Sequence, residues 1–150
     1  MTSSNPALVV PDASVLVGWF LSDEECCPGS ERLMADFEAR RVAPLAPPLL
    51  KHEIMNTLSL AVKRRRMARE AAVLAWNAFM DLGILFAEPD RFGRSVMALA
   101  SLPGVSVYDA TYVALAESYS CTCYTLDKKL VAAVRAHTNR VRLVSEYPAV

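Results

Sequence analysis

Short runs of continuous apolar residues alternate along the chain with longer segments in which apolar positions recur at helical spacing. The short, β-rich runs predict strands over Leu8 to Val10, Val42 to Leu45, Ile84 to Ala87, Cys121 to Leu126 and Val141 to Val144. The longer segments predict helices over Ala13 to Leu21, Gly29 to Arg40, Leu49 to Arg64, Ala68 to Leu82, Arg91 to Leu102, Ser106 to Tyr119 and Asp127 to His137. A polar break is expected at Ser22 to Glu25. Strands that alternate with helices are typical of an α/β sandwich around a mostly parallel sheet.

The length and composition suit one globular domain. The chain has 150 residues, of which 53% are hydrophobic and 21% charged, enough to bury a proper core. Because no repeat, low-complexity stretch or long linker divides it, we expect a single domain over residues 1–150. No apolar run approaches the roughly eighteen residues of a membrane span. The N-terminal segment has no basic run before its short apolar stretch, so we do not expect a secretion signal.

The charges balance, with sixteen basic and sixteen acidic residues. A neutral total gives no support for broad, non-specific affinity for nucleic acid, but it does not exclude a local basic surface. The run Lys63 to Arg66 suits a solvated helix end, where cations complement the helix dipole. A dedicated phosphate contact is the alternative interpretation of this run.

The four cysteines favour free thiols. Cys26 and Cys27 are adjacent, and Cys121 and Cys123 lie two apart in a predicted strand, so their side chains share one face. Zinc ligands are usually spaced with two to four intervening residues and come as paired knuckles or with histidines, which this pattern does not match. We expect buried, unpaired thiols, which fit a protein located in the reducing cytoplasm.

Two acids fall where a predicted strand ends. Asp12 separates two apolar runs in the segment ALVVPDASVLV, where burial makes a charge unfavourable. Asp127 follows the strand that ends near Leu126 and precedes a helix. Ligand sites of parallel sheets form beyond the carboxyl ends of the strands. For Asp127, a helix N-cap is the simpler alternative.

Two further acids fall on predicted helices. Glu53 shares a helical face with apolar and small polar residues, and Asn56, one turn further on, is placed to hold its carboxylate. Asp109 is a lone charge near the start of a helix that is apolar almost all round, which predicts burial. An N-cap, or an acid favoured by the helix dipole, is the alternative for Asp109.

Taken together, the four acids favour a divalent cation. Carboxylates brought close in a dry cleft raise each other's pKa, and a cation supplies the opposite charge. Mg²⁺ and Mn²⁺ prefer such oxygen ligands. There is no zinc-type cluster, the five glycines are scattered and form no phosphate loop, and His52 and His137 lack a nucleophile signature and suit surface or helix positions.

The ordered acidic motifs resemble those of the PIN-domain family, most closely the VapC-type toxin ribonucleases of bacterial toxin–antitoxin systems. The resemblance covers nearly the whole chain. The motifs are VVPDASVLV around Asp12, PLLKHEIMN around Glu53, SVYDATYVALA around Asp109 and TLDKKL around Asp127. Each is weak alone, and their order and spacing carry the resemblance. Pro11 is a mild departure, since a simple apolar or polar residue is more usual before the aspartate.

The resemblance implies a three-layer α/β/α sandwich and metal-dependent endoribonuclease activity with Mg²⁺ or Mn²⁺. The four acids would be the catalytic and metal-binding residues, with Asp12 and Asp109 as the main ligands. Ser14 and Thr125 match small hydroxyl positions and would orient carboxylates. Basic residues at the rim would offset phosphate repulsion, with Lys51, Lys128 and Lys129 as candidates. The resemblance also implies a homodimer and a small antitoxin partner.

Two other functions are alternatives to the nuclease interpretation. A catalytically silent module could keep the fold and bind RNA or protein, although it has no need of four unfavourable charges. A phosphorylated receiver-like domain needs a mid-chain strand that ends in aspartate, whereas Ile84 to Ala87 is followed by Glu88-Pro89. A dimer or antitoxin surface and plain core packing explain the aromatic residues of the helices equally well, namely Trp19, Phe20, Phe37, Trp76 and Phe79.

Overall fold

The computed structural model describes residues 5–21 and 26–148, so the polar break expected at Ser22 to Glu25 lies outside the described residues. The strands are β1 (Ala7–Pro11), β2 (Val42–Ala46), β3 (Leu85–Phe86), β4 (Thr122–Thr125) and β5 (Val141–Leu143). The α-helices are α1 (Ala13–Val17), α2 (Pro28–Glu38), α3 (Leu49–Lys63), α4 (Arg69–Met80), α5 (Gly93–Ala100), α6 (Val107–Ser118) and α7 (Lys128–Val134). Two 3₁₀ turns, η1 (Pro89–Arg91) and η2 (Val144–Glu146), complete the described elements.

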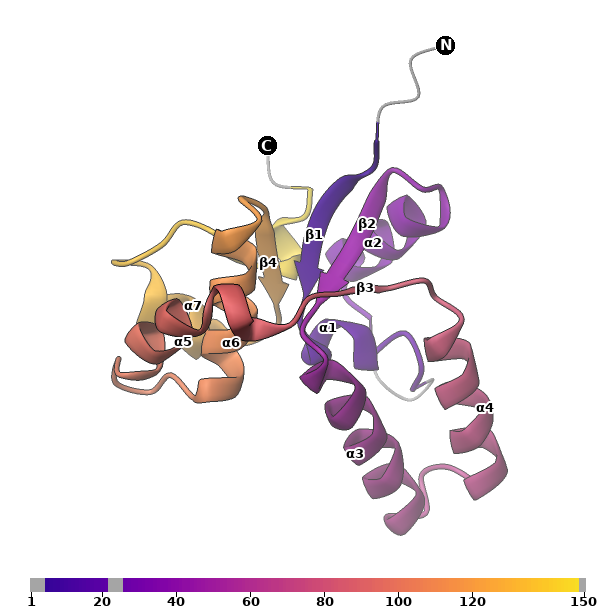
Figure 1. Cartoon of the computed structure of the whole chain (residues 1–150). Helices are drawn as coiled ribbons and strands as arrows, with labels where there is room; N and C mark the ends of the chain where they lie inside the picture. Colours follow the sequence, from indigo (N-terminus) through magenta and orange to yellow (C-terminus); the bar gives the residue numbers. More distant parts are fainter. Residues whose placement is uncertain (1–4, 22–25, 149–150) are drawn as a thin grey trace.

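The strands form one sheet in the order β3-β2-β1-β4-β5, and every pair of neighbours is parallel. The first strand is therefore the central one, and the carboxyl ends of all strands meet at one edge of the sheet. In Figure 1, α1 and α3 begin beside the arrowheads of β1 and β2. The predicted α/β/α fold with a parallel sheet is confirmed.

Each face of the sheet carries its own apolar core. Successive side chains of a strand point to opposite faces, and Val10 and Cys123 belong to one buried cluster while their neighbours Val9 and Tyr124 belong to another. The larger cluster includes residues of α3 to α7, and the smaller one includes residues of α1, α2 and η2. The sheet therefore holds β1 between two helical layers, which isolates the end of β1 from water.

Several predicted elements are shorter in the structure. The first helix ends at Val17, with Gly18 as its C-cap, although its pattern predicted a helix to Leu21. The strand predicted over Ile84 to Ala87 keeps only two residues, because it is an edge strand that pairs with β2 alone. The helix predicted from Arg91 begins as a 3₁₀ turn with Pro89 in its first turn and continues from Gly93.

Packing and burial bear on the expectations for the cysteines and for the aromatic residues. All four cysteines are free thiols, as predicted, but only Cys121 and Cys123 are buried, while Cys26 and Cys27 are half-buried. The aromatic residues pack among themselves and against the core, as the pairs Trp19–Phe37, Phe20–Phe79 and Trp76–Phe79. None of the described helices is long and apolar enough to cross a membrane.

Candidate active site

Asp12 lies at the carboxyl end of the central strand and caps α1. Its backbone N–H donates to the carbonyl of Tyr124 at 3.0 Å, which fixes it between β1 and β4. Its Oδ1 accepts from the Ser14 hydroxyl at 2.5 Å and from the Val15 N–H at 3.2 Å. With 8% of its surface exposed, burial raises the pKa of Asp12. The hydrogen bonds that oppose this rise do not cancel it, and the charge of Asp109 adds to it.

Two hydroxyls connect Asp12 to the loop after β4. The Ser14 hydroxyl, which donates to Asp12, accepts from the Leu126 N–H at 3.1 Å. Thr125 is fully buried, hydrogen-bonds the Asp12 carboxylate, and accepts from the Asp127 N–H at 3.0 Å. The parallel pairing of β1 with β4 brings these groups together, so the orientation of Asp12 depends on both strands.

Glu53 projects from α3 and is held by a residue that the sequence patterns did not indicate. The phenol of Tyr112, a buried residue of α6, donates to Glu53 Oε2 at 2.5 Å. We expected Asn56 to hold this carboxylate, but its side chain is exposed on α3. Burial is the main cause that raises the pKa of Glu53, the Tyr112 hydrogen bond lowers it, and the charges of Asp12 and Asp109 raise it further.

Asp109 occupies the first turn of α6 and is half-buried. It is not the N-cap, which is Ser106: the Ser106 hydroxyl accepts from the Asp109 N–H at 3.0 Å and donates to its Oδ2 at 2.7 Å. This reciprocal arrangement resembles a capping box. It fixes the Asp109 carboxylate close enough to Asp12 and Glu53 for its charge to raise the pKa of both.

Asp127 differs from the other three acids. It is exposed and caps α7, where its Oδ1 accepts from the N–H groups of Lys129 at 2.8 Å and Leu130 at 3.1 Å. Asp127 is therefore an N-cap, as Asp12 is for α1, and its part in an acidic pocket stays a prediction. It still lies at the carboxyl edge of β4, where its N–H donates to the Thr125 hydroxyl.

The donor chemistry of the acids suits a hard divalent cation, because carboxylate oxygens are what Mg²⁺ and Mn²⁺ prefer. Within residues 5–21 and 26–148, however, no group of three or more acidic, histidine or cysteine side chains lies close enough to hold one ion. The acids are therefore not arranged as a preformed cage of four carboxylates. Since Mg²⁺ usually keeps several waters and binds through one or two carboxylates, the interacting pair Asp12 and Asp109 still fits it.

The predicted rim lysines lie in the first turns of two helices, α3, which follows β2, and α7, which follows β4. Lys51 is half-buried in the first turn of α3, and its Nζ lies 4.3 Å from the centre of the Phe86 ring. Lys128 and Lys129 are exposed in the first turn of α7, directly after Asp127. All three positions place a cation near the carboxyl edge of the sheet.

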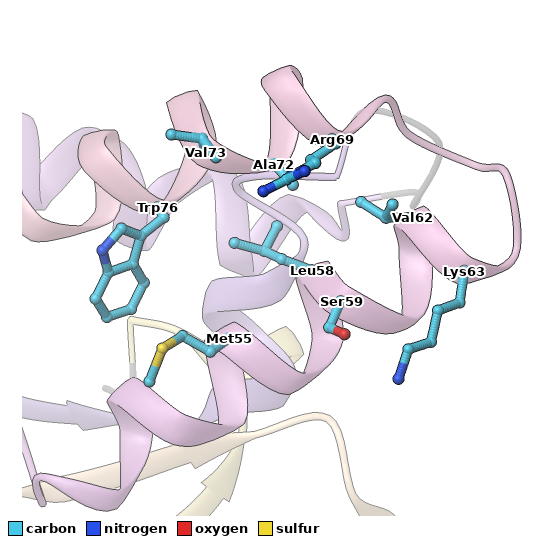
Figure 2. Close-up of a pocket in the computed structure, with 9 residues that line it drawn as sticks. All are labelled: Met55, Leu58, Ser59, Val62, Lys63, Arg69, Ala72, Val73 and Trp76. Carbon is cyan, nitrogen blue, oxygen red and sulfur yellow. The ribbon is translucent and has the colours of Figure 1, made fainter.

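A separate apolar groove lies between α3 and α4 and encloses about 370 Å³. Figure 2 shows the side chains that line it, with Met55 and Trp76 at one end and Lys63 and Arg69 at the other. Within residues 5–21 and 26–148, the lining of this groove contains no acidic residue. The described acids gather instead at the carboxyl edge of the sheet, which is the candidate active site.

Comparison with known proteins gives matches among solved structures. No family model and no curated protein matches the chain. The Mycobacterium tuberculosis toxin VapC20, which cleaves the sarcin-ricin loop, superposes with a TM-score of 0.61 at 19% identity over 89% of this chain and 98% of its own. A toxin–antitoxin complex from Klebsiella pneumoniae superposes with a TM-score of 0.61 at 16% identity, over 92% and 97%. The chain has the fold of VapC-type toxins, as its motifs implied.

Proposed function

We propose that the protein is a VapC-like endoribonuclease that hydrolyses RNA phosphodiester bonds with Mg²⁺ or Mn²⁺. The observation that carries this proposal is the buried Asp12 carboxylate at the end of the central strand, beside Asp109 and Glu53. The charge of Asp109 raises the pKa of Asp12, and the charges of Asp12 and Asp109 raise the pKa of Glu53, so this grouping of carboxylates is unfavourable without a counter-charge. A divalent cation supplies that charge, and the fold shared with VapC20 agrees with a role in RNA cleavage.

Asp12 and Asp109 would hold the cation, directly or through water. When bound, the ion would supply a water of lowered pKa for in-line attack on phosphorus and stabilise charge on the phosphate oxygens. Ser14 and Thr125 orient the Asp12 carboxylate by the hydrogen bonds described above, as partners of metal ligands commonly do. Glu53, held by Tyr112, and Asp127 would complete the negative pocket from opposite sides.

The substrate is itself an anion, so an acidic pocket needs cations at its rim. Lys51 on α3 and the pair Lys128 and Lys129 on α7 have the charge and the position for phosphate contacts. Such contacts position a nucleic acid without reading its sequence. We therefore assign these lysines to substrate binding and the acids to the reaction itself.

The proposed partners follow from the family that the motifs resemble and from the Klebsiella neighbour, which is a toxin–antitoxin complex. We propose that a small antitoxin neutralises the protein in the cytoplasm and that the protein forms homodimers. Light scattering of the purified protein tests the second proposal. Inspection of the neighbouring genes for a small reading frame, followed by co-purification with its product, tests the first.

The decisive experiment replaces Asp12 or Asp109 with Asn and measures RNA cleavage with added Mg²⁺ or Mn²⁺. We expect each variant to lose at least about a hundredfold in rate, because the ion contributes several kcal/mol to transition-state stabilisation. Asp81→Asn is the matched control, since Asp81 is an exposed acid at the end of α4. Undiminished cleavage in the Asp12 and Asp109 variants would show that the proposed mechanism is wrong.

A further inference from the structure

Two exposed aromatic rings lie at the carboxyl edge of the sheet, and the mechanism proposed above uses neither. Tyr108 precedes Asp109 in the first turn of α6, and 65% of its surface is exposed. Phe86 ends β3 and is 37% exposed. Packing does not account for Tyr108 in particular, which belongs to neither apolar cluster of the core.

The register of the sheet places Phe86 beside the acids. Val9 of β1 pairs with Pro44 of β2, so Pro11 lies opposite Ala46 two residues further on, and Ala46 pairs with Phe86. Neighbouring strands are about 4.8 Å apart, so the backbone of Phe86 lies about 10 Å from the strand end that carries Asp12. Tyr108 lies in the first turn of α6, next to Asp109, whose charge acts on Asp12.

Phe86 also contacts a cation. The Lys51 ammonium lies 4.3 Å from the centre of its ring. A cation–π contact at an exposed site is weak and is easily exchanged. A phosphate that draws the ammonium away leaves the ring free for a base, so Lys51 of α3 and Phe86 of β3 together supply a phosphate contact and a stacking surface.

We infer that Tyr108 and the Phe86–Lys51 pair are two base-stacking positions that hold RNA on either side of the acids. The inference rests on the proposed function, and it assigns binding residues which that function leaves open. Unpaired bases stack on aromatic side chains, whereas paired bases are not available for such stacking. Tyr108 and Phe86 therefore select segments whose bases are unstacked next to the scissile phosphate.

The test compares variants that keep or remove the rings. Tyr108→Ala and Phe86→Leu remove a flat ring, and Phe86→Leu keeps an apolar side chain so that β3 stays packed. Tyr108→Phe and Phe86→Trp keep a ring. The matched control is Tyr119→Ala, because Tyr119 is an aromatic residue, 44% exposed, at the opposite end of α6.

KM and kcat are measured on an unstructured oligoribonucleotide and on the same strand annealed to its complement. In Tyr108→Ala and Phe86→Leu, loss of one stacked base raises KM for the unstructured strand between about fivefold and a hundredfold and leaves kcat unchanged. The ring-keeping variants and Tyr119→Ala keep the wild-type KM and kcat. Lys51→Met lowers the slope of log KM against log salt by about 0.7, the value for one phosphate contact on a single strand.

The two levels of the proposal fail in different ways. If the wild-type protein cleaves RNA and the ring-removing variants keep its KM, or share an increase with Tyr119→Ala, the stacking positions are wrong and the nuclease stands. An increase in KM that is as large for the annealed duplex as for the single strand also contradicts stacking. If the wild-type protein cleaves neither substrate with Mg²⁺ or Mn²⁺, the proposed function itself is wrong.

Discussion

Asp12 shows how one residue links the fold to its chemistry. The central place of β1 between β2 and β4 removes its last residues from water. Burial penalises the charged form of the carboxylate more than its hydrogen bonds favour it, so its pKa is raised. The same burial is what makes a counter-ion favourable at this position.

The raised pKa of Asp12 makes stability depend on pH. The native state holds this proton to a higher pH than the unfolded chain, so stability falls as pH rises from about 3.9, the ordinary value, through the raised pKa. Asp12→Asn removes this loss and still offers an acceptor oxygen for capping. We expect the variant to melt at a higher temperature than the wild-type protein at pH 7, with the difference shrinking toward pH 4. Thermal denaturation across this range without added metal measures it.

Tyr112 gives a second prediction at the residue scale. Tyr112→Phe removes the hydrogen bond to Glu53, so the pKa of Glu53 rises further and its carboxylate loses its fixed position. We expect the free energy of unfolding to fall by about 1–2 kcal/mol and the rate of cleavage to fall roughly tenfold. Chemical denaturation and cleavage kinetics follow the two effects. Tyr119→Phe is the control, since Tyr119 is an exposed tyrosine at the end of the same helix, and it should change neither stability nor cleavage. If the pH dependence of cleavage is the same in Tyr112→Phe as in the wild-type protein, Tyr112 does not set the pKa of Glu53.

At the scale of elements, capping residues place the acids. Three of the helices that begin at the carboxyl edge start with a polar cap, namely Asp12 for α1, Ser106 for α6 and Asp127 for α7. A cap satisfies N–H groups that the helix leaves unpaired. The helix starts therefore fix the direction of these side chains before any substrate arrives.

Ser106 tests this role. Ser106→Ala removes the cap of α6 and the hydroxyl that donates to Asp109. We expect a loss of about 1 kcal/mol in stability, together with weaker cleavage because Asp109 is no longer held. Ser106→Thr keeps both hydrogen bonds and should restore both properties. A variant that loses stability but cleaves normally would limit Ser106 to capping.

The contact between α2 and η2 gives another prediction for elements. A Cβ on Gly29 would lie 1.8 Å from the carbonyl oxygen of Val144, which is backbone and has no room to move. Gly29→Ala should therefore destabilise the protein by about 3 kcal/mol. Gly93→Ala is the matched control, since nothing lies within 4 Å of its Cβ position, and it should be neutral or slightly stabilising. Urea denaturation compares the two.

For the whole molecule, binding of a divalent ion should appear as stability. An ion that binds only the native state adds about 2.7 kcal/mol at a concentration one hundred times its Kd. We expect Mg²⁺ or Mn²⁺ to raise the melting temperature of the wild-type protein to a plateau, and not that of an Asp12→Asn, Asp109→Asn double variant. NaCl at matched ionic strength is the control. A wild-type protein without a saturable shift would favour a silent binding module over a nuclease.

The sequence by itself determined the succession of strands and helices along the chain and the positions of the acids within it, because periodicity and caps act within a few residues. Its errors lie at element ends, as at Val17 and in β3, where tertiary packing overrides local preference. The motif resemblance also anticipated the fold that the solved structures share. Whether these acids bind metal stays a prediction.

Only the tertiary structure decided which of these residues meet. Tyr112, and not Asn56, holds Glu53, although Tyr112 and Glu53 lie 59 positions apart in the sequence. Asp109 lies close enough to Asp12 and Glu53 for its charge to raise the pKa of both, while Asp127 is exposed at the start of α7. The order of the strands within the sheet sets these neighbours. No local pattern encodes that order, because the interactions that fix it join distant parts of the chain.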